Sequence, residues 1–243
     1  MVHMSKTPHA LRKGFKRTFL QDVSAVVKFA ETDLLSNREA LKSFFKVRFG
    51  ISEEFEIPKL SAVDIVSENK SERFHFTNSL ASVLVDVNIY RFYEESLEPR
   101  INDLISFLEA IGISQVETFS LCKRNVFPGT TSNAFEVWKK AIVETFRKGN
   151  IQDLAKTAGI KDKPFKMSIE DVSKTEWGEL MVPFSIEVSD SNSFKFQLDL
   201  IASSKSVMIK DLTRVGTIMN NSIFSAFTEI ASDKLLELLQ QEG

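Results

Sequence analysis

Apolar residues recur at every second position in several stretches of the chain and at helical spacing in others. Alternation of this kind predicts strands that are buried on one side, whereas spacings of three and four residues predict amphipathic helices. The stretches typical of strands are Leu20–Phe29, Phe55–Val66, Glu72–Asn78, Ser82–Phe92, Gln115–Phe127, Phe165–Ser173, Trp177–Ser189, Ser193–Ser203 and Val207–Leu212. The stretches typical of helices are Asn37–Phe49, Glu94–Ile111, Asn133–Lys148, Ile151–Ala158 and Thr217–Gln240.

Both halves of the chain follow the same order of elements: a strand, a helix, three or four strands, and a helix. Short stretches also match between the halves. PKLSAVDIVS from Pro58 resembles PFKMSIEDVS from Pro164, and VLVDVNI matches FQLDLIA, which sets Asp86 against Asp199. We therefore predict an internal duplication. The alternative is a chain of two unrelated α+β halves.

Long amphipathic helices that follow runs of strands predict an α+β fold with its helices on one face of a curved, antiparallel sheet. We expect a flexible basic arm at 1–18, a first unit at 19–113 and a second unit at 114–243, with both units in one continuous sheet. This twofold order of elements resembles the duplicated fold of the TATA-box-binding protein family. The resemblance concerns topology only, so it implies a fold and no function.

Polar residues interrupt the most apolar strand candidate, SVLVDVNIYRF at 82–92. Strand alternation directs its valines toward the helices and its polar residues toward the opposite face, and FKFQLDL at 194–200 alternates in the same way. The residues predicted on the helix-free face are Asp86, Asn88, Tyr90, Lys195, Gln197 and Asp199. Because an antiparallel sheet can leave one face in water, this face is either a solvated surface or a partner-binding face.

The charges of the chain nearly balance, with 31 Lys and Arg against 33 Asp and Glu and a formal net charge of -2. Such a chain has no overall positive field that would gather phosphates. A nucleic-acid-binding protein is therefore an alternative that needs a local basic patch, and central carboxylates on the sheet disfavour it. The candidate residues for this patch are Arg12, Lys13, Lys16, Arg17, Lys123 and Arg124.

Residues for catalysis or metal binding are sparse. His3, His9 and His75 lie far apart, and the usual Cys and His ligand spacings are absent, so no metal site is predicted. Cys122 lies in a predicted strand, where it is more typical of a core than of a nucleophile paired with His75. Nine glycines and no phosphate-binding motif predict no cofactor. A small-molecule-binding or enzymatic cavity between sheet and helices is a second alternative.

Apolar runs and cysteine content bear on the compartment. No apolar stretch has the length needed to span a bilayer, and Cys122 has no second cysteine for an internal disulfide. We therefore expect a soluble, cytoplasmic protein. Phenylalanine accounts for 21 residues against two tyrosines and two tryptophans, which indicates that most of its rings lie in a core, since they carry no polar group.

Four stretches of the chain, FLQDVSAVVKF, VDVNIYRFYEESLEPRINDLISFL, LCKRN and NNSIFSAFTEIASDKLLELL, resemble a sporadically distributed bacterial family of uncharacterised proteins. The resemblance spans nearly the whole chain and implies a cytoplasmic bacterial protein. Our leading hypothesis is a non-enzymatic protein-binding or regulatory module of an accessory, defence or toxin-neutralising system, with a protein partner whose identity the sequence does not give.

Overall fold

The computed structural model describes residues 19–49, 61–129, 165–188, 194–231, 236 and 239–240. Three short turns of helix lie at Leu34–Ser36, Tyr93–Leu97 and Ile209–Asp211. The strands and longer helices are β1 (Leu20–Lys28), α2 (Arg38–Phe49), β2 (Val63–Val66), β3 (Glu72–Phe76), β4 (Leu80–Asp86), α3 (Glu98–Ala110), β5 (Gln115–Gly129), β6 (Phe165–Thr175), β7 (Gly178–Val188), β8 (Phe194–Met208) and α6 (Leu212–Ile230). None of the helices in this part of the chain is long and apolar enough to cross a membrane.

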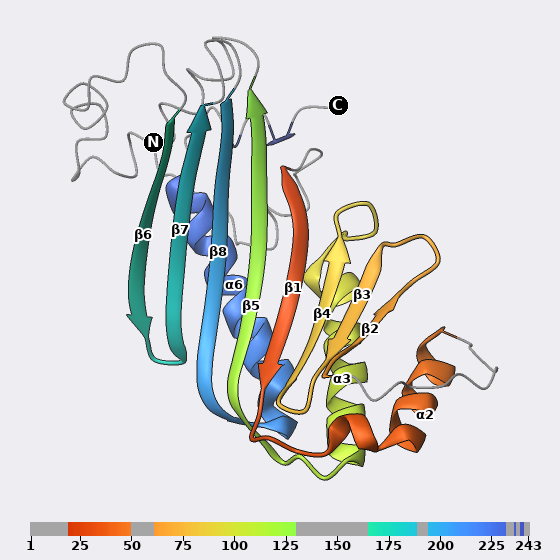
Figure 1. Ribbon diagram of the computed structural model, residues 1–243. Coiled ribbons are helices and arrows are strands. Elements are labelled where there is room, and N and C mark those ends of the chain that lie inside the picture. The colour runs from red at the N-terminus through yellow and green to blue at the C-terminus, as the bar shows by residue number, and fades with distance from the viewer. Residues whose placement is uncertain are drawn as a thin grey trace.

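The strands form one eight-stranded antiparallel sheet in the order β2-β3-β4-β1-β5-β8-β7-β6. The order β2-β3-β4-β1 of the first half recurs as β6-β7-β8-β5 in the second, and the halves meet where β1 pairs with β5. The sheet is curved, and α3 and α6 both lie behind it in Figure 1. The α+β architecture predicted from the sequence, with the same unit twice and helices on one face of an antiparallel sheet, is confirmed.

The core lies between the sheet and these helices. The alternate side chains of β1 and β4 that point toward the helices, Val23, Ala25, Val27, Val83 and Val85, are at most 1% exposed. This is the side that strand alternation assigns to the helices. Burying each of these valine side chains contributes about 1.5–3 kcal/mol to folding, so the alternation fixes which face of the sheet is covered.

Phenylalanine rings fill the core beneath α2 and α3. The ring of Phe44 in α2 meets Phe74 and Phe76 of β3 and Phe107 of α3 at centroid separations of 5.2, 5.4 and 5.3 Å. Phe76 and Phe107 contact each other at 5.1 Å. The angled contacts are of the kind that aromatic quadrupoles favour. The expectation that phenylalanine serves the core holds for this group.

Four charged side chains form an ionic cluster at the border of the aromatic core: Arg48, Glu72, Arg100 and Asp103. The carboxylate of Glu72 in β3 accepts hydrogen bonds from Arg48 Nη2 and Arg100 Nη2, each at 2.5 Å. Arg48 Nε also lies 3.2 Å from Asp103 Oδ2. Burial raises the pKa of Asp103, and the neighbouring Arg48 and Arg100 act in the opposite direction. The cluster joins α2, β3 and α3.

Several element boundaries differ from the sequence prediction. The strand predicted at 82–92 ends at Asp86, because the N–H groups of Ile89 and Tyr90 donate to the Asp86 carbonyl and turn the chain. The separate strand predicted at Val207–Leu212 is wrong: β8 continues to Met208, and α6 already begins at Leu212. The arm at 1–18 and the helices predicted at 133–148 and 151–158 lie outside the described residues.

Gly216 permits α6 to approach the turn that precedes α3. A Cβ at this position would overlap the hydroxyl of Tyr93, which is 1% exposed, and would lie 3.4 Å from Phe119 Cε1. We expect Gly216→Ala to lower the free energy of unfolding by about 1–3 kcal/mol in urea titrations, because overpacking outweighs the better helix propensity of alanine. Adding Tyr93→Phe removes the overlapping oxygen, so the double variant should recover part of the loss. A Gly216→Ala variant as stable as the wild type would contradict this packing.

Candidate interaction face

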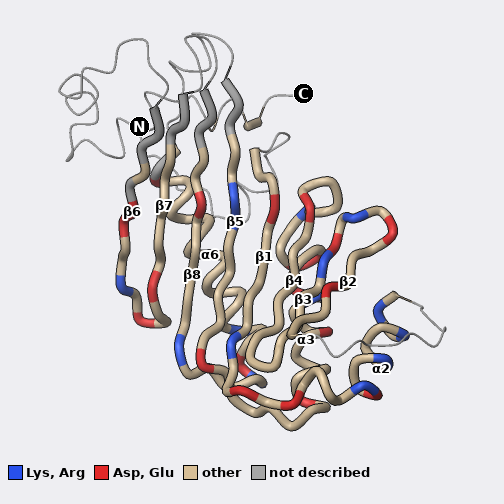
Figure 2. The backbone as a smooth tube through the Cα atoms, in the orientation of Figure 1, with Lys and Arg blue, Asp and Glu red and all other residues tan. Residues whose placement is uncertain are grey.

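The side of the sheet opposite α3 and α6, here called the open face, carries charged residues in its middle. Asp86 of β4 pairs with Asp22 of β1, Asp22 with Arg124 of β5, and Arg124 with Asp199 of β8. Residues directly opposite in antiparallel strands direct their side chains to the same face, so these four form one charged row across adjacent strands. Figure 2 shows these charged positions side by side on β8, β5 and β1.

Arg124 is the cation of the charged row and is shared between two carboxylates. Its Nη1 lies 3.7 Å from Asp22 Oδ2, and its Nε lies 3.4 Å from Asp199 Oδ1. Gln197, two residues from Asp199 in β8, donates from Nε2 to Asp199 Oδ2 at 3.0 Å. One guanidinium against three carboxylates leaves the charged row with an excess of two negative charges.

The electrostatics of Asp22 reflect this excess. Burial raises its pKa, Arg124 lowers it, and the charges of Asp199 and Asp86 raise it again. A further cation placed over this row would therefore find an unbalanced negative field. Despite the shared carboxylates, the described residues contain no group of three or more His, Cys, Asp or Glu arranged to hold a metal ion.

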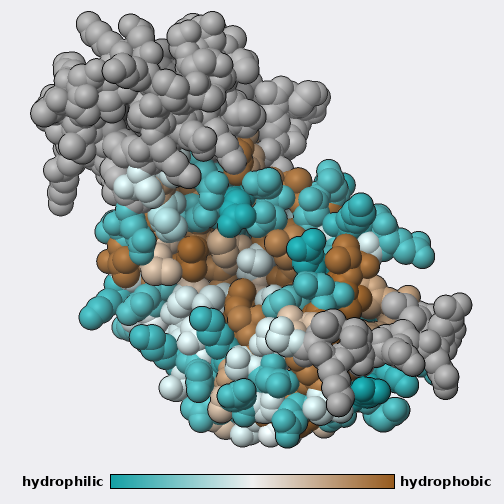
Figure 3. All heavy atoms as spheres, viewed as in Figure 1, coloured by the Kyte–Doolittle hydropathy of each residue, from teal (hydrophilic) through white to brown (hydrophobic). Residues whose placement is uncertain are grey.

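An apolar band runs beside the charged row, two positions further along the strands. Its members lie opposite one another on adjacent strands: Leu84 of β4, Cys122 of β5, Ile201 of β8, Met181 of β7 and Val172 of β6. Ser24 of β1 lies between Leu84 and Cys122. Val172 is 49% exposed at its β6 end. Figure 3 looks onto the open face and shows hydrophobic spheres running across its middle between hydrophilic ones. None of the described helices covers this band.

Cys122 lies in the apolar band and is poorly suited to nucleophilic chemistry. Burial raises the pKa of its thiol to about 12, and Asp199 adds to the rise while Arg124 opposes it. The reactive thiolate is therefore scarce at neutral pH. His75 lies in β3, three strands away in the sheet, a separation of roughly 14 Å, and its Nδ1 lies 3.1 Å from Asp64 Oδ1. The two residues do not form a catalytic pair.

The residues predicted on the helix-free face separate into distinct places. Asp86, Gln197 and Asp199 lie on the open face, in or beside the charged row. Lys195 lies in β8 opposite Glu187, at a position whose side chain is outside the described residues. Asn88 does not continue a strand: its N–H donates to Asp86 Oδ1 at 2.8 Å in the turn after β4.

Tyr90 lies on the other side of the sheet. The ammonium of Lys123 sits 5.5 Å from the centre of its ring and donates to Asn220 Oδ1 of α6 at 2.6 Å. Lys123 pairs with the fully buried Val23, so it belongs to the helix-facing side of β5. The prediction that Asp86, Asn88 and Tyr90 share one strand face is wrong because the strand ends at the first of them.

The basic residues proposed for nucleic-acid binding do not form a common patch in the described part of the chain. Lys123 faces α6, whereas Arg124 faces the opposite side and pairs with Asp22 and Asp199. Neighbours along a strand point to opposite faces, so these two cannot act together on one phosphate backbone. Arg12, Lys13, Lys16 and Arg17 lie outside the described residues.

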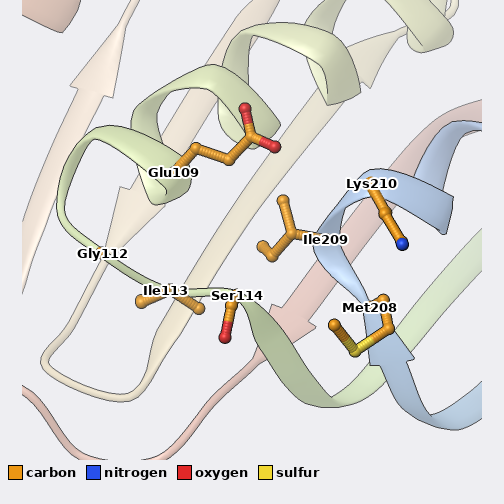
Figure 4. A pocket seen from close by; sticks show the side chains of 7 residues that line it. All are labelled: Glu109, Gly112, Ile113, Ser114, Met208, Ile209 and Lys210. Carbon is orange, nitrogen blue, oxygen red and sulfur yellow. The ribbon is translucent and has the colours of Figure 1, made fainter.

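A surface depression of about 360 Å³ lies at the end of α3, away from the charged row. Its lining comes from the C-terminal end of α3, the link to β5, and the junction of β8 with α6. Figure 4 shows the side chains of Glu109, Ile209 and Met208 around it. Ile209 N–H donates to the Ser114 carbonyl at 3.0 Å across this region. The depression lies at the ends of these elements. The cavity considered from the sequence was placed elsewhere, between the sheet and its helices.

Asp22 and Ser24 on the open face were not singled out from the sequence. The signal was present, because both lie on the side of β1 opposite its buried residues Val23, Ala25 and Val27. Which side chains lie beside Asp22 and Ser24 depends on how β1 pairs with β4 and β5. The sequence of one strand alone does not determine that pairing. Glu72 was missed in the same way, although it lies at every-second-residue spacing with Phe74 and Phe76 on the buried side of β3.

No family model matches the chain, and no curated protein matches it. Among solved structures, the chain is similar to the TBP of Methanococcus jannaschii at 12% sequence identity and a TM-score of 0.28, with 85% of this chain and 97% of that chain covered. The expected membership of a bacterial family of uncharacterised proteins stays a prediction.

Proposed function

We propose that the chain is a non-enzymatic protein-binding module that receives its partner on the open face of the sheet. The observation that carries the proposal is the charged row, in which Arg124 pairs with Asp22 and Asp199 while Asp86 adds a third carboxylate beside Asp22. Its excess negative charge favours a partner surface that presents Lys or Arg side chains. The apolar band beside it supplies area that such a partner can remove from water.

The charge of this face speaks against the nucleic-acid alternative. A sheet that binds a phosphate backbone needs free cations on its surface. Here the guanidinium of Arg124 is engaged by Asp22 and Asp199, and the row as a whole repels anions. The same argument disfavours phosphorylated small molecules on this face.

The biological setting that we propose rests on the sequence resemblance. We place the module in the bacterial cytoplasm, in an accessory, defence or toxin-neutralising system. Such systems rely on protein partners held by surface complementarity, and a face that combines an acidic row with an apolar band suits this mode of recognition.

Asp86→Asn tests the proposal, because it removes the negative charge and keeps one acceptor oxygen. An asparagine Oδ1 can still accept the Asn88 N–H, so we expect the free energy of unfolding to change by less than about 0.5 kcal/mol. Loss of the carboxylate should weaken partner binding by about thirtyfold, which corresponds to ~2 kcal/mol. The partner is identified by affinity capture with the wild type, and its affinity for each purified variant is then measured by calorimetry.

Glu109→Gln is the matched control, since it removes the same charge from an exposed residue of α3 on the covered side of the sheet. It should bind the partner as the wild type does. Equal affinity of the wild type and Asp86→Asn would refute the open face as the binding site. A strongly destabilised Asp86→Asn would make this aspartate a structural residue instead.

A further inference from the structure

β6 is a long strand at one edge of the sheet. Its eleven residues pair with β7 from Phe165↔Val188 to Thr175↔Gly178, and no described strand lies on its other side. The opposite edge, β2, has only four residues. Short edge strands resist pairing with other chains, whereas a long one offers a row of unpaired backbone groups. The two edges of this sheet therefore differ in their capacity to bind another strand.

The β6–β7 hairpin fixes which backbone groups of β6 point outward. Thr175 and Gly178 flank a two-residue turn and pair directly, so they form the hydrogen-bonded kind of pair. Bonded and non-bonded pairs then alternate along the ladder, which directs the N–H and C=O groups of Glu170, Val172 and Lys174 away from β7. Pro183, which has no N–H, fits this pattern, because it lies opposite Glu170 at a non-bonded position.

The same three residues present exposed side chains on the open face. Val172 is opposite Met181 and ends the apolar band, and it is one of the few exposed large apolar residues among those described. Glu170 and Lys174 flank it with opposite charges, two positions away on either side. On an unpaired edge, Glu170 and Lys174 have no cross-strand neighbour on this side. An antiparallel strand paired with β6 would lie opposite both charges.

We propose that β6 pairs antiparallel with β6 of a second copy of this chain, with the two Val172 residues opposite each other on the symmetry axis. In this register, Glu170 of each copy lies opposite Lys174 of the other, which gives two complementary cross-strand pairs. The outward N–H and C=O groups of Val172 bond to each other across the axis, as the ladder pattern requires. The apolar band then continues from one copy into the next, in an isologous dimer.

Charge selects this register over full overlap of the strands. Centring the pair on Glu170 would set Lys166 opposite Lys174 twice, which is repulsive. Shifting the centre to Val172 removes that clash and leaves an overlap of residues 169–175. A contact of this size buries little area, so the dimer is weak, with a Kd in roughly the micromolar-to-millimolar range. The proposal is independent of the partner-binding function of the charged row.

Sedimentation equilibrium over a hundredfold range of concentration tests the dimer, with Val172→Pro as the decisive variant. Proline removes one outward N–H of β6 and leaves the β7 ladder intact. We expect the wild type to dimerise with concentration and Val172→Pro to stay monomeric, a loss of at least about tenfold in affinity. Val66→Pro is the matched control on the other edge strand. Ser67 N–H donates to the Glu72 carbonyl, so the neighbouring Val66 is at a non-bonded position and its N–H also points away from the sheet. It should dimerise normally.

A charge exchange tests the register. Glu170→Lys places lysine opposite Lys174 of the other copy and should weaken the dimer, whereas Glu170→Lys with Lys174→Glu restores opposite charges and should rescue it. Thermal unfolding of each variant checks folding, since Lys174 also lies opposite Glu179 in its own chain. A wild type that is monomeric throughout, or a dimer that survives Val172→Pro, overturns the proposal. Absence of rescue in a folded double variant overturns the register.

Discussion

Replacing Glu72 by Gln is expected to lower the free energy of unfolding by about 3–5 kcal/mol, measured by urea titration. The Glu72 side chain is 10% exposed and binds Arg48 and Arg100 at 2.5 Å each. Its loss leaves two guanidiniums facing a neutral amide, with Asp103 as the other carboxylate of the ionic cluster. Breaking a buried ion pair from one side costs more than the pair itself contributes, because the remaining charge stays desolvated.

Asp64→Asn is the control for this experiment. Asp64 also forms an ion pair, with His75, but the two side chains are 53% and 33% exposed. Exposed pairs contribute little, so the expected change is below about 0.5 kcal/mol. If Glu72→Gln costs no more than Asp64→Asn, the ionic cluster does not hold α2 and α3 on the sheet.

The sequence predicted the elements and their faces where hydrophobic alternation was strong. β1 and β5 lie within two residues of their predicted bounds, since Val23, Ala25 and Val27 alternate without interruption. The duplicated order also follows from the sequence, because a unit that repeats its pattern repeats its packing. Boundaries were less accurate where side chains rather than periodicity end an element, as at Asp86.

The charged row shows what a single sequence does not specify. Alternation tells on which side of its own strand each of Asp22, Asp86 and Arg124 lies. Only strand pairing shows that the three side chains are neighbours. β1 pairs with β4 and β5, which lie about 60 and 100 residues further along the chain. The positions of these side chains relative to one another depend on loop lengths and on the whole sheet. No local propensity encodes them.

The error at Asn88 and Tyr90 has a different cause. The stretch after Asp86 keeps a strand-like composition, and propensity alone extends the strand. Asp86 instead uses both its carbonyl and its carboxylate to accept hydrogen bonds from the N–H groups of Asn88, Ile89 and Tyr90, a competing local pattern typical of aspartate. The carboxylate in the middle of an apolar stretch was the sign of the strand end.

Replacing Arg124 by Gln should also destabilise the folded state. It leaves Asp22, Asp86 and Asp199 adjacent with no cation between them, and Asp22 and Asp199 have side chains only 16% and 14% exposed. We expect a loss of about 2 kcal/mol in the free energy of unfolding near pH 7, measured by urea titration. This is less than for Glu72, because the Arg124 side chain is 42% exposed and water weakens its pairs.

The loss should shrink in acid, and its pH dependence tests the origin of the effect. The pKa of Asp22 is already raised above its ordinary value of 3.8, and removing Arg124 raises it further. The folded state then binds the proton more tightly than the unfolded chain, so stability rises as the pH falls toward 3.8. Arg214→Gln, which affects only the exposed pair with Asp211, should show no such trend. A deficit of Arg124→Gln that stays constant between about pH 7 and pH 4.5 would exclude carboxylate repulsion.

The same variant separates the two classes of partner. Arg124→Gln makes the charged row more negative by one unit, so a cationic protein partner should bind at least as tightly as it binds the wild type once the folded fraction is taken into account. A phosphate-bearing partner held by Arg124 would bind less tightly, because its contact cation is gone. Calorimetric titration of wild type and variant at two salt concentrations measures both effects. Weaker binding by the variant, with a steeper loss at low salt, would overturn the acidic face as the attractive element.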